Sequence, residues 1–254
     1  MNNRKKKKSR NMTKKKKRLQ SFKNPYPKKK IWFVIPAFNE EKSIGGVLAE
    51  LINCKYRFIV VVDDCSKDNT YQEAKKQGKS VTVFRHVINR GQGAALRTGI
   101  DYALKKGAEY IVTFDSDGQH RVEDLPAMLR PVVEQGYEVS LGSRFLKKTR
   151  MPLSRRVLLK GSVLVQWMFY GVKLSDAHNG FRVFSRKAAQ KIRIDSDRME
   201  HASEIVEKMV KNNIRYKEVP VTIRYTGYSM KKGEGSLFGA LRVLFKMIIR
   251  RLTH

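Results

Sequence analysis

Two aspartates one residue apart are the most chemically suggestive feature of this 254-residue sequence. Asp115 and Asp117 stand in the segment FDSDGQH, directly after the apolar run Tyr110–Phe114. Paired carboxylate oxygens are the ligands that a hard divalent cation such as Mg²⁺ or Mn²⁺ prefers. A cation held there could bridge a diphosphate and neutralise the charge that develops as the diphosphate leaves. A D-x-D pair is common by chance, so its meaning depends on what accompanies it.

Two further polar clusters follow apolar runs in the same way. PAFNEE (36–41) comes after Ile31–Ile35, and DDCSKDNT (63–70) comes after Phe58–Val62. A single Asp or Asn after a strand often does no more than cap the next helix, and Asp68 or Ser43 could serve in that way. Three such clusters at one edge of a sheet favour a ligand site over three unrelated helix caps.

A glycine-rich segment, NRGQGAALRTG (89–99), leads into a predicted helix. Gly91 and Gly93 would let the backbone approach a ligand, and the start of a helix favours anions. The spacing matches neither G-x-G-x-x-G nor a P-loop. The segment is therefore either a tight turn or a phosphate contact, and the pattern by itself does not choose between them.

The elements that must position these residues alternate along the first half of the chain. Continuous apolar runs of this length are typical of strands buried on both faces of a parallel sheet. The predicted strands are Ile31–Ile35, Phe58–Val62, Val81–Arg85, Tyr110–Phe114 and Glu138–Gly142, and the predicted helices are Ser43–Leu51, Asn69–Gln77, Ala94–Lys105 and Glu123–Gln135. Strand–helix alternation predicts an α/β fold with an open, mostly parallel sheet flanked by helices. Ligands bind such sheets beyond the carboxyl ends of the strands, where the three polar clusters fall.

The second half is less regular. Glu218–Tyr225 alternates like a strand, with Val219, Val221, Ile223 and Tyr225 on one face. Val157–Val172 is apolar on nearly all sides but too short to span a bilayer, so it is either a core helix or an interfacial one. Residues 236–254 predict an amphipathic helix with one apolar and one basic face.

The charge of the chain is extreme, with 54 Lys and Arg against 23 Asp and Glu and a formal net charge of +31. Residues 1–30 are a polybasic arm with almost no apolar content, which predicts disorder. We therefore divide the chain into this arm, a domain over 31–235 and the helix over 236–254. Such a basic chain should bind a polyanion, either nucleic acid, anionic lipid or a phosphate-rich substrate. Cys54 and Cys65 are too few for a disulfide framework, which favours a reducing compartment.

Taken together, IPAFNEE, VVDDCSKDNT, NRGQGAALRTG, FDSDGQH, LGSRF, NGFRVF and PVTIRYTGYS resemble the inverting family 2 glycosyltransferases with the GT-A fold. The resemblance is strongest to dolichol-phosphate mannose synthase and its bacterial polyprenyl-phosphate relatives, and it covers about Ile31 to Arg250. It implies transfer of a sugar from a UDP- or GDP-linked donor to a polyprenyl phosphate at the cytoplasmic membrane face, with Mg²⁺ or Mn²⁺ as cofactor.

The resemblance also implies roles for individual residues. On the donor side it places Pro36, Ala37, Asn39, Glu40, Asp63, Asp64, Gly91, Gly93, Asp115, Ser116 and Gln119. The metal would be held by Asp115, Asp117 and Gln119, and the catalytic set would be Asp117, Arg144, Arg155 and Arg224. On the acceptor side stand Gly180, Phe181, Arg182 and Lys231. The three arginines are expected to point away from the core and to grip the lipid phosphate.

The sequence departs from the family at three places. Cys65 stands where the family has Gly, KKGEGS (231–236) shifts the lysine placement around Lys231, and members with membrane spans continue past the position of His254. Because no run of 18 apolar residues occurs, we expect no spanning helix. The expected location is cytoplasmic and peripheral on an anionic membrane, where a separate membrane protein could use the product.

The acceptor decides which residues are needed. A hydroxyl acceptor requires a general base, for which His178, His201 and Glu204 are candidates, whereas a lipid phosphate is already anionic and needs cations instead. The chain is poor in bases and rich in arginine, which favours the phosphate. The alternatives are a saccharide hydroxyl acceptor, a nucleotidyltransferase (disfavoured by the acidic loop after the first strand), and a basic nucleic-acid-binding protein, for which no sequence-specific signature occurs.

Overall fold

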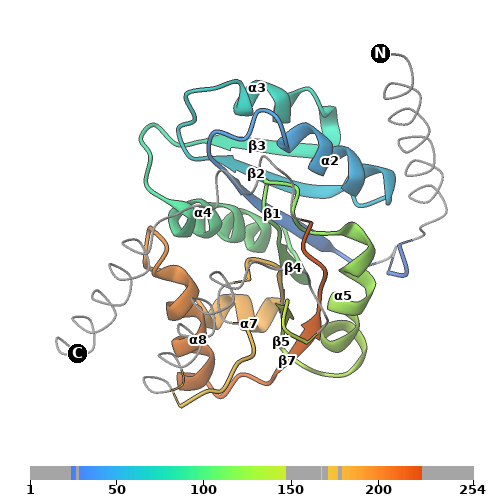
Figure 1. Ribbon diagram of the computed structural model, residues 1–254, viewed down its shortest axis with the longest axis vertical. Helices are drawn as coiled ribbons and strands as arrows, with labels where there is room; N and C mark the ends of the chain where they lie inside the picture. Colours follow the sequence, from blue (N-terminus) through green and yellow to red (C-terminus); the bar gives the residue numbers. More distant parts are fainter. Residues whose placement is uncertain (1–23, 27–28, 147–166, 168–170, 177–178, 225–254) are drawn as a thin grey trace.

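Seven strands form one mixed sheet at the centre of the computed structural model, which describes residues 24–26, 29–146, 167, 171–176 and 179–224 (Figure 1). Their order across the sheet is β3-β2-β1-β4-β6-β5-β7. The strands are β1 (Ile31–Ala37), β2 (Phe58–Asp63), β3 (Val81–Arg85), β4 (Tyr110–Thr113), β5 (Val139–Ser143), β6 (Arg182–Ser185) and β7 (Tyr216–Pro220). The first four pair in parallel, as their continuous apolar runs predict.

Helices cover both faces of the sheet (Figure 1). The helices are α2 (Ile44–Asn53), α3 (Thr70–Lys75), α4 (Gln92–Lys105), α5 (Leu125–Glu134), α7 (Arg186–Lys191) and α8 (His201–Lys211), with short 3₁₀ turns at Gly78–Ser80 and Val122–Asp124. Two apolar cores result, because successive side chains of a strand point to opposite faces. Phe33 and Ile35 of β1 pack under α2 and α5, whereas Trp32 and Val34 pack on the side of α4, α7 and α8.

The predicted α/β architecture, an open and mostly parallel sheet flanked by helices, is confirmed. One strand runs against the others: β6 is antiparallel to both β4 and β5. NGFRVF (179–184) is a motif of the sequence, but its pattern predicted no strand. Its insertion matters for function, because pairing Thr113 with Arg182 brings Asn179 and Gly180 to the end of β4, where Asp115 begins the acidic segment.

The predicted strand Glu218–Tyr225 was wrong in its limits, since β7 ends at Pro220. The alternation itself is real, because Val219, Val221 and Ile223 are all buried. Beyond Pro220 the backbone leaves the sheet, because its N–H groups donate to a side chain and to a loop carbonyl instead of to a neighbouring strand. Asp124 accepts from the Thr222 N–H at 2.8 Å, and the Gln119 carbonyl accepts from the Arg224 N–H at 2.8 Å.

Three predicted segments lie outside the described residues: the arm over 1–30 apart from its last few residues, most of Val157–Val172, and the helix over 236–254. Their proposed roles therefore stay predictions. Within the residues that the structure does describe, no helix is long and apolar enough to cross a membrane.

Gly99 gives a direct test of the close packing between α4 and β1. A Cβ at Gly99 would overlap Cγ1 of Val34 on β1, whereas a Cβ at Gly46 on α2 would meet nothing within 4 Å. We expect Gly99→Ala to lower the free energy of unfolding by about 1–3 kcal/mol, because overpacking outweighs the helix propensity of alanine. Gly46→Ala, the matched control, should raise it by up to about 1 kcal/mol. Urea unfolding of both variants checks this, and equal stabilisation by both would contradict it.

Candidate functional site

Three loops meet at the carboxyl-end edge of the parallel strands and are joined by hydrogen bonds. The Ser66 hydroxyl accepts from the Asn39 N–H at 2.9 Å, and Asn39 Oδ1 accepts from the Lys67 N–H at 2.9 Å. The Ser116 hydroxyl donates to the Pro36 carbonyl at 2.8 Å. Asn39 adopts a left-handed backbone (φ 53°), a conformation that Asn tolerates better than most residues. The three polar clusters predicted to share one edge therefore form one connected site.

Several residues assigned to the donor side serve the frame of this edge. Ala37 accepts from the Asp64 N–H at 2.8 Å through its carbonyl. The Glu40 carboxylate accepts from the Ser43 hydroxyl at 2.5 Å near the start of α2 and is buried. The Asp63 side chain has no exposed surface and lies 3.2 Å from Arg85 Nε. The Asp63 carboxylate is thus buried and the Glu40 carboxylate bonds Ser43, while the donor-side roles of both residues stay predictions.

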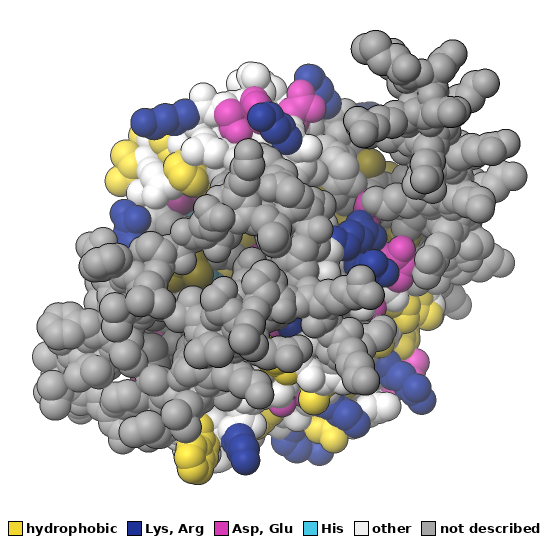
Figure 2. Space-filling view, viewed as in Figure 1, with side chains coloured by type: hydrophobic (Ala, Val, Ile, Leu, Met, Phe, Trp, Pro, Cys, Tyr) yellow, Lys and Arg dark blue, Asp and Glu magenta, His cyan; other side chains and the backbone are white. Residues whose placement is uncertain are grey.

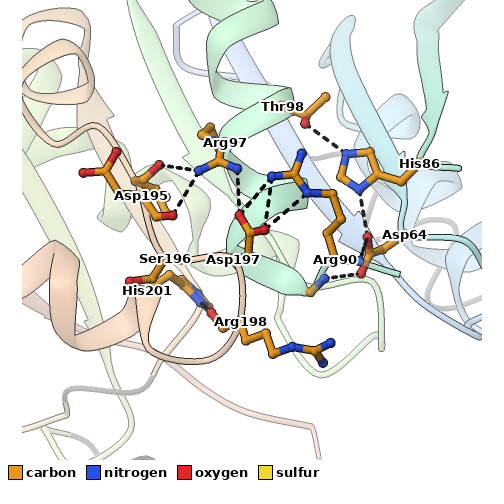
Figure 3. Close-up of polar contacts among 12 residues, drawn as sticks. Asp64, His86, Arg90, Arg97, Thr98, Asp195, Ser196, Asp197, Arg198 and His201 are labelled. Carbon is orange, nitrogen blue, oxygen red and sulfur yellow. Dashed lines mark hydrogen bonds and ion pairs between the residues drawn. The ribbon is translucent and has the colours of Figure 1, made fainter. Parts of the chain in front are cut away.

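Asp64 anchors the glycine-rich loop. Its carboxylate receives the His86 ring at 2.8 Å, the Arg90 N–H at 3.0 Å and the Gly91 N–H at 2.6 Å (Figure 3). Asp64 is 3% exposed. A buried carboxylate with three donors is a stable arrangement, since each donor compensates part of the lost hydration. Asp64 thus fixes the loop that borders the donor side, and direct contact of its side chain with a ribose stays a prediction.

The sequence left open whether Gly91 and Gly93 form a tight turn or contact a phosphate. In the structure, both glycines lie against another loop of the protein. A Cβ at Gly91 would lie 2.6 Å from the Asp197 carbonyl, and one at Gly93 would overlap the Ser196 carbonyl. Asp197 is held by Arg97 at 2.7 Å and Arg90 at 3.1 Å (Figure 3). The two glycines therefore let loop 194–198 dock on the start of α4. This close approach explains why glycine stands at both positions, and a phosphate contact of their backbone stays a prediction.

The acidic pair lies at the end of β4. His120 Nε2 is 2.8 Å from Asp115 Oδ2, and the Gln92 amide donates to Asp115 Oδ1 at 3.3 Å. Burial raises the pKa of Asp117 to about 6, and the neighbouring charge of Asp115 adds to this. Burial acts on Asp115 in the same direction, but the charge and hydrogen bond of His120, followed by Arg182 and His201, hold its pKa below the ordinary value.

Two partly exposed carboxylates that repel one another fit a divalent cation. Asp115 keeps 28% of its side chain exposed. Gln119 donates its amide N–H to Asp117 Oδ2 at 2.6 Å and its backbone N–H to Oδ1 at 2.9 Å, which leaves Gln119 Oε1 as the atom that could face the ion. No group of three His, Cys, Asp or Glu gathers among the described residues, so a substrate diphosphate would have to complete the coordination.

Gly180 and His120 are the residues that hold Asp115 in place. A Cβ at Gly180 would lie 2.5 Å from both carboxylate oxygens of Asp115, so only glycine leaves room for the acid. The His120 ring packs against Phe114 and Phe181, each at 5.2 Å between centroids. Phe181 has no exposed surface, and its side chain supports His120. A contact of Phe181 with the acceptor stays a prediction. No role was predicted for His120 or Gln92, although His120 stands in FDSDGQH and Gln92 in NRGQGAALRTG.

Arg182 is buried as well. It is 4% exposed, and its Nε donates to the Asn179 carbonyl at 3.1 Å. Burial lowers the pKa of the Arg182 guanidinium to about 10, against the favourable charges of Asp115 and Asp176. A guanidinium with this pKa stays charged at neutral pH. Arg182 therefore influences the site through its charge near Asp115, and its side chain offers little exposed surface to an acceptor.

The predicted arginine cluster does not form as expected among the described residues. Arg144 is 8% exposed and makes a two-pronged pair with Asp176, at 2.6 and 2.7 Å. Arg224 bonds Glu50 and Glu123, each at 3.1 Å. The expectation that Arg144 points away from the core is therefore wrong. Arg155 and Lys231 lie outside the described residues, so their roles stay predictions.

The candidate bases are engaged elsewhere. Glu204 is 1% exposed and accepts from the backbone N–H groups of Asp195 and Ser196, each at 2.8 Å, so it shapes loop 194–198. His201 donates a hydrogen bond from Nδ1 to the Arg198 carbonyl at 2.7 Å. Burial, aided by the charge of Arg182, lowers the pKa of His201 to about 4. His178 lies outside the described residues.

Arg198 is a cation that the sequence analysis missed. It belongs to loop 194–198, and its side chain lies over Gly91, where Cγ would be 2.8 Å from an added Cβ. It is exposed, and no interaction is drawn to its guanidinium in Figure 3. The neighbouring Gln92 reaches Asp115, and Gly91 binds Asp64. Arg198 therefore lies beside the glycine-rich loop, whose Gly91 and Gln92 contact Asp64 and Asp115.

Comparison with known proteins agrees with this arrangement. The family model for glycosyl transferase family 2 matches residues 32–193. The chain is a member of glycosyltransferase family 2. An uncharacterized protein of Methanocaldococcus jannaschii is 42% identical over 234 residues, covering 90% of this chain and 95% of that protein. A protein of Methanococcus voltae named UDP-N-acetylglucosamine–dolichyl-phosphate N-acetylglucosaminyltransferase is 33% identical, covering 88% of this chain and 97% of its own length.

Solved structures support the fold of this glycosyltransferase. Glucosyl-3-phosphoglycerate synthase of Mycobacterium tuberculosis, in complex with Mn²⁺, UDP and phosphoglyceric acid, superposes with a TM-score of 0.64. The match covers 92% of this chain and 82% of that one at 16% sequence identity. At this identity the likeness shows the GT-A fold, and the enzyme's ligands stay those of that protein.

The buried pair of Arg144 and Asp176 predicts a structural effect of mutation. Arg144→Ala should lower the free energy of unfolding by about 3–5 kcal/mol, because it leaves Asp176 charged and buried without its main partner. Arg130, which pairs with Glu134 while 66% exposed, is the matched control. Arg130→Ala should cost less than about 0.5 kcal/mol. Denaturant unfolding measures both, and an Arg144→Ala variant as stable as wild type would show that the pair is not structural.

Proposed function

We propose that this glycosyltransferase moves a sugar, with inversion, from a UDP- or GDP-linked donor to a polyprenyl phosphate at the cytoplasmic membrane face. The observation that carries the proposal is that Glu204 and His201, the two candidate bases among the described residues, are poorly suited to accept a proton. Glu204 is committed to the backbone of loop 194–198, and burial leaves His201 with a pKa of about 4. A hydroxyl acceptor would need a base with a pKa near the working pH. A phosphate acceptor needs none, because it is already an anion.

In the proposed reaction, a phosphate oxygen of the acceptor attacks the anomeric carbon. The bond from that carbon to the donor diphosphate breaks, and the nucleoside diphosphate leaves with the electron pair. A divalent cation held by Asp115 and Asp117, with Gln119 beside them, would neutralise the charge on that leaving group. His120 and Gly180 hold Asp115 in position for this, since one orients the carboxylate and the other leaves room for it.

Two phosphate groups must approach each other, so the site needs cations. We infer that Arg198 supplies one, because it is exposed and lies beside Gly91, whose neighbours Asp64 and Gln92 border the acidic site. Arg155 and Lys231 remain proposed contacts to the acceptor phosphate. Arg144 and Arg224 contribute through position: Arg224 joins α2 to the loop of Asp117, since its N–H bonds the Gln119 carbonyl and its guanidinium bonds Glu50.

The Methanococcus voltae relative supports this acceptor class, because its name specifies a dolichyl phosphate acceptor and a UDP-linked donor. Mn²⁺ and UDP in the structure of the Mycobacterium tuberculosis enzyme support a metal and a nucleotide in this fold. We further propose that residues 1–30 and 236–254 attach the domain peripherally to an anionic membrane, where a separate membrane protein uses the product. Each basic residue near such a surface contributes roughly 1 kcal/mol of binding free energy.

A label-transfer assay tests the proposal. The purified full chain is incubated with Mn²⁺, a short-chain polyprenyl phosphate and radiolabelled UDP- and GDP-sugars in turn. We expect one sugar to enter the organic extract as a mild-acid-labile product, and we expect no transfer in EDTA. Label that appears instead in a water-soluble saccharide added as a competing acceptor would establish a hydroxyl acceptor. Unlabelled extract with every donor would contradict the proposed function.

Asp117 allows a test in which activity and stability change in opposite directions. A carboxyl pKa raised to about 6 means that the folded state binds a proton more tightly than the unfolded state, so stability falls as pH rises from about 4 to about 6. Asp117→Asn removes the cost of the buried charge. In EDTA at pH 7.5 it should therefore raise the free energy of unfolding by roughly 1–2 kcal/mol, while turnover with Mn²⁺ falls roughly 100-fold or more.

Asp101→Asn is the matched control, since Asp101 is an exposed carboxylate on α4. It should change neither stability nor turnover. Thermal unfolding with and without Mn²⁺ and UDP gives the second measurement: the ligands should raise the melting temperature of wild type and of Asp101→Asn but not of Asp117→Asn. An Asp117→Asn protein that keeps this ligand-induced stabilisation would rule out Asp117 as a metal ligand.

A further inference from the structure

Val87 and Ile88 are the outermost side chains of the loop between β3 and α4. Val87 is 93% exposed and Ile88 is 66% exposed. We call these two residues the apolar tip. Scattered exposed aliphatic residues are ordinary on protein surfaces, so exposure alone carries no meaning. What distinguishes this pair is how the rest of the loop is built.

The polar residues of the loop are bonded to the protein. The His86 ring lies between Asp64 Oδ1 at 2.8 Å and the Thr98 hydroxyl at 3.0 Å (Figure 3). The Asn89 amide donates to the Asp64 carbonyl at 3.1 Å. Cys65 Sγ lies 3.4 Å from the Val87 carbonyl. Arg90 is anchored by its N–H on Asp64 and by its side chain on Asp197. The polar residues thus bond to the protein, although Asn89 and Arg90 keep exposed surface, while Val87 and Ile88 are presented to the outside by a backbone that Asp64 holds.

The position and charge of the tip indicate what it meets. β3 is parallel to β2, β1 and, across the sheet, β4, so the loop lies at the same edge as Asp115 and Asp117. Residues 74–100 contain six Lys and Arg and no Asp or Glu. Arg85, just before the loop, keeps 40% of its side chain exposed. Figure 2 shows hydrophobic side chains bordered by Lys and Arg over this part of the surface.

We propose that the apolar tip enters the interfacial region of an anionic bilayer and turns the active-site edge of the sheet toward the lipid. The inference rests on the proposed function, because a polyprenyl phosphate is presented at such a surface. Apolar side chains flanked by cations match this interface, where acyl chains lie below a layer of negative headgroups. The rigid base on Asp64 fixes the angle at which the site meets the membrane.

Tryptophan placed in the tip tests this directly. Ile88→Trp in the full chain is mixed with vesicles of phosphatidylcholine containing phosphatidylglycerol, and its emission is compared with that of wild type, which supplies the background of Trp32 and Trp167. We expect a blue shift and quenching by brominated acyl chains. Val210→Trp is the matched control: Val210 is 40% exposed near the end of α8, which leads into the amino end of the parallel strand β7 at the opposite edge of the sheet. It should show neither effect.

Val87→Ser with Ile88→Ser gives the functional measurement. We expect the double variant to lose several-fold of its rate on polyprenyl phosphate in vesicles and to keep the rate on a detergent-dispersed short-chain acceptor. Unshifted, unquenched Ile88→Trp emission in vesicles would overturn the inference while leaving sugar transfer to lipid, and hence the proposed function, intact. A raised donor KM with unchanged vesicle dependence would also overturn it, since the tip would then serve the nucleotide. Absence of any sugar in lipid, with the tip still quenched, would refute the proposed function alone.

Discussion

The carboxylate of Asp115 is the constraint on which the rest of the site depends. It sits at the end of β4, between the His120 ring, the Gln92 amide and the Cα of Gly180, with no room for a further atom beside Gly180. These three neighbours come from three different parts of the chain. The acid can occupy this position only because β6 enters the sheet antiparallel and the start of α4 comes close. The position of Asp115 therefore depends on the packing of these separate parts of the fold.

A second set of contacts joins the two halves of the domain across the glycine-rich loop. Asp64 holds one side of this loop, and Asp197, between Arg90 and Arg97, holds the other. Glycine is required at positions 91 and 93 because loop 194–198 approaches their backbone too closely for a side chain. The glycine-rich motif thus joins two loops, and it positions Gln92 beside Asp115. A contact of its backbone with the donor stays a prediction.

The arginines show how burial changes a role inferred from chemistry. Arg144 and Arg224 have the fork geometry that suits phosphate, but each is already matched by carboxylates of the protein. Removing a charge from such a buried pair costs stability first, and any effect on the acceptor would be mixed with that loss. The exposed cation that we propose for the phosphate groups belongs to loop 194–198, a segment without a recognisable motif. Cys65 has a left-handed backbone with φ of 62°, a conformation that glycine adopts more readily, which agrees with the glycine expected there from the family resemblance.

The sequence by itself determined the five strands that read as apolar runs, the shared edge at which three polar clusters meet, the acidic pair and the family. These are local properties, because strand periodicity and motif spacing are written in neighbouring residues. Only the tertiary structure decided that β6 runs against its neighbours, that Asp63 and Phe181 are buried, and that Arg144 meets Asp176. Such outcomes depend on which distant segments come into contact, and Arg144 and Asp176 stand 32 positions apart with no local signal of their pairing. The tertiary structure also decided that Val87 and Ile88 stay outside, because Asp64 binds the polar atoms around them and leaves the apolar ones to the surroundings.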